Sequence, residues 1–338
     1  MVSKDINILF FGLGSIGQRH LRNLKRLLGN KVKFYAYRKT KHVPLLNNKG
    51  DKIKGTIEKK FKVSLIHNLK SLKKYNIDLI FITSPSSLHL DTVLKLKGIE
   101  KSYIFIEKPI DASLKKKKLF INFIKRNKIQ IFVGYNMRFH PCYIKLKNLL
   151  REKIFKKINY TIFKCSENIQ DNHSYENYKI SYAARKKLGG GVCLTNIHEI
   201  DMMLNLFSNT KLITSHSDRL SMLKINVEDF SSSIFTNSFN TKKLVSLIIL
   251  DFFQINKERY IKIIGDDGEI YLDFNNYFLK IIKKGKTKTF NFIKNKNLMY
   301  IDELKLFLNF LKNKKKIPNQ YNEKNAFESL KLALKIKK

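Results

Sequence analysis

The stretch ILFFGLGSIGQRHLRNLKRLLGN, residues 8–30, places three glycines between an apolar run and an amphipathic one. Gly12, Gly14 and Gly17 have the G-x-G-x-x-G spacing. In that motif one glycine makes a sharp turn, one lets backbone approach a pyrophosphate, and one lets a helix pack closely on a strand. Because an apolar strand-like run precedes the glycines and leucines recur at helical spacing after them, the context favours a phosphate-binding turn over an ordinary one.

Strand and helix patterns alternate through the first 135 residues. Apolar runs predict strands, and two amphipathic segments between them predict helices, so we expect a parallel sheet with right-handed crossovers. The predicted strands are 6–12, 32–38, 62–68, 77–83, 102–108 and 129–135, and the predicted helices after the first are 89–97 and 113–126.

The alternation of strand and helix patterns ends after residue 140. Helices are expected near 141–153, 196–207, 299–312 and 323–337, and successive strands between residues 211 and 294 predict a mostly antiparallel sheet. The sequence therefore predicts an α/β protein with a dinucleotide-binding domain over residues 1–130. A second α/β domain over 131–338 is expected to bind substrate and carry the oligomer contacts.

The residues at the end of the second strand suggest which dinucleotide binds. A site for NAD(H) usually places an acidic residue about 20 positions after the glycines, where it holds the ribose 2′-hydroxyl. No Asp or Glu lies between Asp5 and Asp51, and the strand ends in YRKTK. Arg38 and Lys39 predict pairing with a 2′-phosphate, and hence a preference for NADP(H) over NAD(H). The alternative is that Arg38 is one more exposed base in a basic chain.

Four later segments bear side chains suited to chemistry. They are TSPSSLH (83–89), EKP (107–109), GYNMRFHP (134–141) and GGGVCLTNIHEID (189–201). Ligands of an open parallel sheet bind beyond the carboxyl ends of its strands, so Pro85 and His89 are expected to face the cofactor. Lys108 is expected beside the nicotinamide, where desolvation lowers an amine's pKa. Taken singly, each residue also has a purely structural interpretation, such as an interdomain salt bridge for Arg138.

Together these segments make the chain resemble the Gfo/Idh/MocA family, the glucose–fructose oxidoreductase and inositol dehydrogenase group. The resemblance implies a Rossmann domain, a second domain with a large open sheet, a nicotinamide cofactor in the cleft and a sugar-like or cyclitol-like substrate. It also implies that Lys108 transfers a proton and that His198 binds and orients substrate. The family commonly has an aspartate shortly before this histidine, where the present chain has Thr195 or Leu194.

The segment IQDNHSYENYKISYAARKKLGGG also resembles a substrate loop of a sugar-active branch, of the form LPDWHPYEDYR. Asp171, His173, Glu176 and Tyr178 keep their places in it. Asn172 replaces the tryptophan of the pattern, so the resemblance implies either a more flexible loop or a different substrate.

The resulting site prediction has three parts. Lys108 and His198 are the predicted catalytic residues. Cofactor contacts are predicted for Gly12, Gly14, Ser15, Ile16, Gly17, Arg38, Lys39, Ser84, Pro85, His89 and Glu107. Substrate contacts are predicted for Asn136, Arg138, His173, Tyr178, Tyr182, Thr195 and Asp201, and no metal site is predicted.

The predicted activity is hydride transfer between NADP(H) or NAD(H) and a sugar, sugar derivative or nucleotide sugar. Arg138 and the basic field suggest an anionic substrate. Three alternatives stay open: an enzyme that oxidises transiently, eliminates and reduces again; a non-catalytic protein that retains the cofactor cleft; and a polyanion-binding protein.

Composition bears on the last alternative and on localisation. The 338 residues carry a formal net charge of +40, but the lysines are spread along the whole chain, so compositional drift is favoured over nucleic-acid binding. Three cysteines without metal-ligand spacing indicate a reducing compartment. With no signal peptide and no apolar stretch of membrane-spanning length, we expect a cytoplasmic protein without membrane contact. An apolar face on the large sheet predicts a homo-oligomer, either a dimer or a tetramer.

Overall fold

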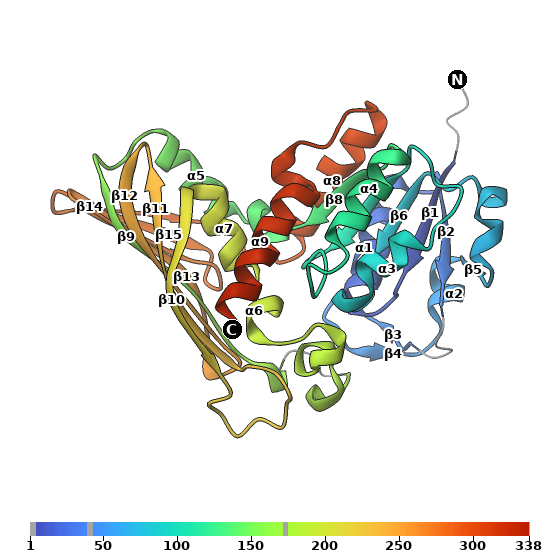
Figure 1. Cartoon of the computed structure of the whole chain (residues 1–338), viewed down its shortest axis with the longest axis horizontal. Coiled ribbons are helices and arrows are strands. Elements are labelled where there is room, and N and C mark those ends of the chain that lie inside the picture. Colours follow the sequence, from blue (N-terminus) through green and yellow to red (C-terminus); the bar gives the residue numbers. More distant parts are fainter. Residues whose placement is uncertain (1–4, 39–42, 172–174, 338) are drawn as a thin grey trace.

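A computed structural model describes residues 5–38, 43–171 and 175–337. Within these ranges, six parallel strands form one sheet in the order β5-β2-β1-β6-β7-β8, and helices connect them (Figure 1). The expected parallel Rossmann sheet is confirmed. Its strands are β1 (Ile6–Phe11), β2 (Val32–Tyr37), β5 (Val63–Ile66), β6 (Leu79–Ile82), β7 (Tyr103–Glu107) and β8 (Gln130–Gly134). Its connecting helices include α1 (Ser15–Leu28), α2 (Ile57–Phe61), α3 (His89–Leu94) and α4 (Lys117–Arg126), and a short hairpin, β3 (Leu45–Leu46) with β4 (Lys52–Ile53), lies beyond β2.

A ladder of phenylalanines runs across the middle of this sheet. Phe10, Phe81, Phe105 and Phe132 come from four neighbouring strands at matching register. Their rings are stacked, with successive centroids 4.9, 5.0 and 5.5 Å apart. Phe307 of α8 (Leu298–Lys312) covers the ladder edge-on. A helix from near the end of the chain therefore completes the core of the first domain.

The second sheet has eight strands in the described part of the chain, in the order β10-β11-β12-β9-β13-β14-β15-β16. Its β12–β9 pair is parallel and the other pairs are antiparallel, so the predicted mostly antiparallel sheet is confirmed. The strands are β9 (Ile158–Asn168), β10 (Ser208–Asp218), β11 (Phe230–Phe239), β12 (Lys242–Asp251), β13 (Phe253–Gly265), β14 (Gly268–Asp273), β15 (Phe278–Lys283) and β16 (Lys286–Asn291).

Helices lie on the side of the second sheet that faces the first domain (Figure 1). They are α5 (Pro141–Arg151), α6 (Val192–Thr195), α7 (His198–Leu206) and α9 (Glu323–Ile336). The strands bury alternate residues toward these helices, as β11 shows with Ser231, Ser233, Phe235 and Asn237. Helix α7 and the end of β8 meet at this boundary, and this is the region where the candidate site is found.

Two further findings bear on the predictions from composition. Cys142, Cys165 and Cys193 are buried free thiols. None of the helices in the described ranges combines the length and apolar character needed to cross a bilayer.

Candidate active site

The glycine turn after β1 is shaped by three different close approaches. Gly12 has φ of +96°, and an added Cβ would lie 2.7 Å from the backbone of Thr83 and Ser84 at the end of β6. A Cβ on Gly17 would lie 2.4 Å from the Gly12 carbonyl oxygen. A Cβ on Gly14 would meet nothing within 4 Å. The outer two glycines therefore let the turn close, and the middle one borders open space.

Helix α1 begins at this open space. Gly14 is its N-cap and provides no side-chain hydrogen bond, and the first turn holds no acidic residue. The first amides of a helix lack partners within the helix, and the helix dipole favours an anion beside them. Ser15 and Ile16 lie in this first turn and are half-buried. The geometry fits the diphosphate of a dinucleotide.

Tyr175 comes from the second domain to the same helix end. Burial raises the pKa of Tyr175 to about 12, and hydrogen bonds with Ser15 oppose that shift. Tyr175 was not among the predicted site residues, although the loop pattern LPDWHPYEDYR has a tyrosine at this place. The segment that begins after residue 174 therefore reaches the glycine turn.

The segment after β6 supplies one unpartnered hydroxyl and one bridging histidine. The buried Ser84 Oγ has no hydrogen-bond partner among the described residues, and Pro85 follows it as the N-cap of a short 3-10 helix. The two ring nitrogens of His89 lie 2.9 Å from the Pro109 carbonyl oxygen and 2.8 Å from the Ser84 carbonyl oxygen. The ring therefore joins the ends of β6 and β7, and its contact with the cofactor stays a prediction.

Glu107 likewise has a protein partner. Its Oε1 lies 2.6 Å from Nε2 of His20 on α1, and its Oε2 accepts from the Lys108 backbone N–H at 3.2 Å. These contacts hold the end of β7 against α1. The carboxylate is directed to the helix and to its own strand end, and its contact with the cofactor stays a prediction.

Lys108 and His198 lie at the boundary between the domains. Lys108 Nζ donates to the Thr195 carbonyl oxygen at 2.6 Å, which ties the end of β7 to α6. His198 is 5% exposed and begins α7. Burial lowers the pKa of His198 well below its ordinary value, and the charges of Lys108 and Arg259 act in the same direction. The imidazole is therefore neutral at neutral pH.

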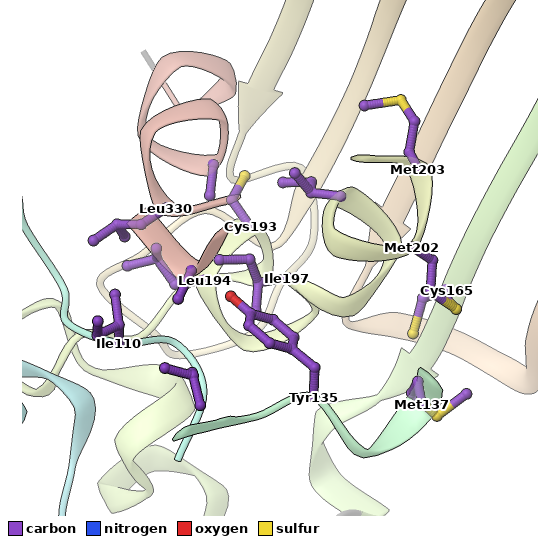
Figure 2. Packing of buried hydrophobic residues seen from close by; sticks show 14 of the residues in the cluster. Ile110, Tyr135, Met137, Cys165, Cys193, Leu194, Ile197, Met202, Met203 and Leu330 are labelled. Carbon is purple, nitrogen blue, oxygen red and sulfur yellow. The ribbon is translucent and has the colours of Figure 1, made fainter. Parts of the chain in front are cut away.

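Unpartnered polar atoms gather around this pair. Thr195 Oγ1, Asn196 Nδ2 and His198 Nδ1 are buried and have no hydrogen-bond partner among the described residues. The Tyr135 and His198 rings are 5.9 Å apart in an edge-to-face contact, and Figure 2 shows Tyr135 projecting toward Leu194 and Ile197. Buried polar atoms without partners are costly.

Arg138 and Asp201 form a buried ion pair. Arg138 Nε donates to Asp201 Oδ2 at 2.7 Å and Nη2 donates to Oδ1 at 2.6 Å, with side-chain exposures of 5% and 1%. Ser329 Oγ and Asn325 Nδ2 of α9 also donate to Asp201. The ion pair joins the segment after β8 to α7, and the two donors connect it to α9. Substrate contacts of Arg138 and Asp201 stay predictions. Both residues lie within the predicted second domain, so this pair is not the interdomain salt bridge considered for Arg138.

The remaining predicted substrate residues are dispersed. Asn136 Nδ2 lies 3.2 Å from Met299 Sδ on α8. The Tyr178 hydroxyl accepts from the Lys224 backbone N–H at 3.4 Å, and Tyr182 packs half-buried against the main core. His173 and Lys39 lie outside the described residues. No group of three His, Cys, Asp or Glu side chains within the described ranges is placed to hold a metal ion.

Two carboxylate–guanidinium pairs beside the site were not anticipated. Arg259 of β13 donates to Glu199 of α7, from Nε at 2.7 Å and from Nη2 at 3.0 Å. Arg38, which follows β2, is ion-paired through Nη1 with Glu58 of α2. The predicted NADP(H) preference rested on Arg38, and this pairing removes its main support. Each pair joins residues at least 20 positions apart, so no local spacing indicates it.

Comparison with known proteins adds independent findings. Residues 6–135 match the model of the GFO_IDH_MocA family, an oxidoreductase family with an NAD-binding Rossmann fold. An uncharacterized oxidoreductase, YrbE, of Bacillus subtilis is 26% identical over 44% of this chain and 41% of its own length. A myo-inositol 2-dehydrogenase of Thermotoga maritima is 29% identical over 40% of this chain and 38% of its own length. The chain thus matches less than half of each of these two relatives.

Solved structures resemble the whole fold. The WlbA dehydrogenase of Bordetella pertussis, in complex with NADH and UDP-GlcNAcA, has a TM-score of 0.73 at 15% identity. That match covers 98% of this chain and 95% of the other. At such low identity the similarity shows that the two-domain arrangement is shared, and it does not transfer the substrate.

Proposed function

We propose that the protein, whose residues 6–135 match the GFO_IDH_MocA family model, transfers hydride between a nicotinamide dinucleotide and a sugar, sugar derivative or nucleotide sugar. The observation that carries the proposal is the cluster of unpartnered buried polar atoms beside Lys108 and His198. A substrate with several hydroxyl groups supplies the missing partners. The inositol dehydrogenase of Thermotoga maritima and the UDP-GlcNAcA complex of WlbA involve compounds of this chemical class.

Lys108 is the proposed acid and base. In the oxidative direction its neutral amine takes the proton of the substrate hydroxyl, and in the reductive direction the ammonium returns it. The bound nicotinamide supplies the hydride acceptor or donor. The Thr195 carbonyl oxygen, 2.6 Å from Nζ, orients the amine in either state.

His198 is proposed to orient substrate. Burial keeps its imidazole neutral, so one ring nitrogen donates and the other accepts a hydrogen bond. The unpartnered Nδ1 is thus suited to a substrate hydroxyl. Tight packing around Tyr135 and Ile197 excludes water, which strengthens these polar contacts.

The test starts from protein purified from its expression host. Mass spectrometry identifies any nucleotide that copurifies, and a panel of sugars and nucleotide sugars is then assayed by the absorbance of reduced nicotinamide. Substrate-dependent formation of reduced dinucleotide supports the proposal. Product formed without net consumption of dinucleotide favours the elimination-type alternative. A protein that binds dinucleotide and turns over nothing in the panel fits the non-catalytic alternative, which the lack of the usual aspartate at Leu194 or Thr195 keeps open.

We further propose that two copies associate through the second sheet. Its strands direct half-buried apolar side chains away from the helices, and Ile234, Leu247 and Ile162 lie side by side at matching register. A continuous apolar row on a sheet face is typical of an interface. The two faces of a symmetric dimer would cover each other.

A further inference from the structure

We propose that Glu58 selects the dinucleotide: its pairing with Arg38 makes the ribose end of the cleft favour NAD(H) and disfavour the 2′-phosphate of NADP(H). The inference rests on the proposed dinucleotide site and assigns a specificity role to a residue of α2.

Arg38 stands where the ribose is recognised in this fold. It follows β2 directly, and Tyr37 at the end of β2 is paired with Phe11, the last residue of β1 before Gly12. The end of β2 is therefore beside the glycine turn. In such sheets the residue at this place contacts the ribose 2′-hydroxyl or 2′-phosphate.

Helix α2 holds Glu58 firmly at this place. The Thr56 side chain caps the helix by accepting from the Lys59 backbone N–H at 3.3 Å, and Ile57 is 1% exposed. Strand β5 follows the helix at once and pairs with β2 along its length. The backbone that carries Glu58 is therefore held in place relative to Arg38 on both sides.

The charges of the two side chains offset each other. The Arg38 side chain is 9% exposed and that of Glu58 is 30% exposed, so the arginine is covered while the glutamate is partly open. An open carboxylate oxygen accepts a hydrogen bond from a ribose hydroxyl. A 2′-phosphate instead brings close to two negative charges beside that carboxylate. The repulsion offsets the attraction by Arg38.

The acidic residue usual in NAD(H) sites is thus supplied from another element. The sequence holds no acid between Asp5 and Asp51, which suggested a phosphate site. The fold places a carboxylate there from residue 58, because the connection from β2 to β5 returns through α2.

The experiment measures dissociation constants of NAD⁺ and NADP⁺ by isothermal titration calorimetry for the wild type and for Glu58→Gln. We expect the wild type to bind NAD⁺ more tightly. In Glu58→Gln the dissociation constant of NADP⁺ divided by that of NAD⁺ should fall about tenfold or more. The variant removes a negative charge beside the 2′-phosphate of NADP⁺, and it removes a charged acceptor for the ribose hydroxyl of NAD⁺.

Two further variants isolate the effect. Glu58→Asp keeps the charge and should keep the preference for NAD⁺. Asp91→Asn removes the carboxylate of another ion pair in the same domain, with Lys116, and should leave the ratio unchanged. An unchanged ratio in Glu58→Gln, or tighter NADP⁺ binding by the wild type, overturns the role of Glu58 alone. Failure of the wild type to bind either dinucleotide overturns the proposed function as well.

Discussion

Single side chains decide whether the cleft is a reaction site, and Lys108 gives the most direct test of the proposed chemistry. Replacing it with methionine keeps most of the side-chain volume and removes the amine. We expect turnover to fall by about 10²-fold or more, the usual contribution of a positioned acid or base. The dinucleotide dissociation constant should change little. The exposed Lys118 on α4 provides the matched control, since Lys118→Met removes one charge from the same domain. Normal turnover of Lys108→Met would exclude the amine from the chemistry.

The glycine turn yields a second prediction at this scale, because two of its glycines differ in surroundings. A methyl group at Gly17 collides with the Gly12 carbonyl oxygen at 2.4 Å, so Gly17→Ala should lower the free energy of unfolding by about 1–3 kcal/mol. A methyl group at Gly14 meets no protein atom within 4 Å. Gly14→Ala should therefore melt close to the wild type and bind dinucleotide more weakly, because the methyl group enters the space of the diphosphate.

Thermal melting and calorimetric titration of both variants separate the two effects. Equal melting temperatures for Gly17→Ala and the wild type would contradict the packing argument. Equal dinucleotide affinity of Gly14→Ala and the wild type would show that the diphosphate does not approach that glycine.

At the scale of the element, periodicity in the sequence predicted most helices and strands, because local burial patterns decide them. The surfaces against which these helices and strands pack were harder to predict. The amphipathic pattern of α8 fits any apolar surface, and only the structure shows Phe307 against the phenylalanine ladder of the first sheet. The same limit explains Arg138 and Asp201. The sequence analysis predicted both as substrate contacts, and their mutual contact depends on how α7 meets the segment after β8.

Helix α8 also contains a buried carboxyl group without a partner. Glu303 is 0% exposed, and neither side-chain oxygen has a hydrogen-bond partner among the described residues. Burial raises the pKa of Glu303 well above its ordinary value, and the nearby Glu107 carboxylate adds to the shift. The folded protein therefore keeps this carboxyl protonated at a pH where the unfolded chain releases the proton.

The consequence is a pH-dependent loss of stability. Below the ordinary pKa of a glutamate, Glu303 is protonated in both the folded and the unfolded state, and the loss of stability vanishes. As the pH rises above that pKa, Glu303 ionises in the unfolded state alone, which lowers the free energy of the unfolded state and so destabilises the fold. We expect Glu303→Gln to raise the free energy of unfolding by about 1–3 kcal/mol at pH 7 and by much less at pH 4. Urea unfolding at both pH values measures this. Glu328→Gln on the exposed side of α9 should show no such difference. A gain that is equal at the two pH values would contradict the titration of Glu303.

For the whole molecule, the two-sheet architecture could be predicted because each half keeps its own pattern, alternating helices and strands first and successive strands later. The ion pair between Glu58 and Arg38 could not, since it depends on how the connection from β2 to β5 returns through α2. The net charge of +40 is a property of the entire surface and identifies no site by itself. It does affect how two copies approach each other, because like charges repel.

The apolar row Ile234–Leu247–Ile162 predicts how the molecule responds to salt and to substitution. We expect a dimer by size-exclusion chromatography with light scattering, with a dimer fraction that rises with ionic strength as the charge repulsion is screened. Leu247→Lys places a charge at the centre of the row and should yield a monomer with unchanged dinucleotide affinity. Ile293→Lys changes an 87% exposed residue beyond β16 and should leave the dimer intact. Dissociation of the dimer by Ile293→Lys would place the contact elsewhere on the molecule. A wild type that stays monomeric at every salt concentration would exclude the dimer. The row on the second sheet is the interface only if the charge at Leu247 dissociates the dimer and the charge at Ile293 does not.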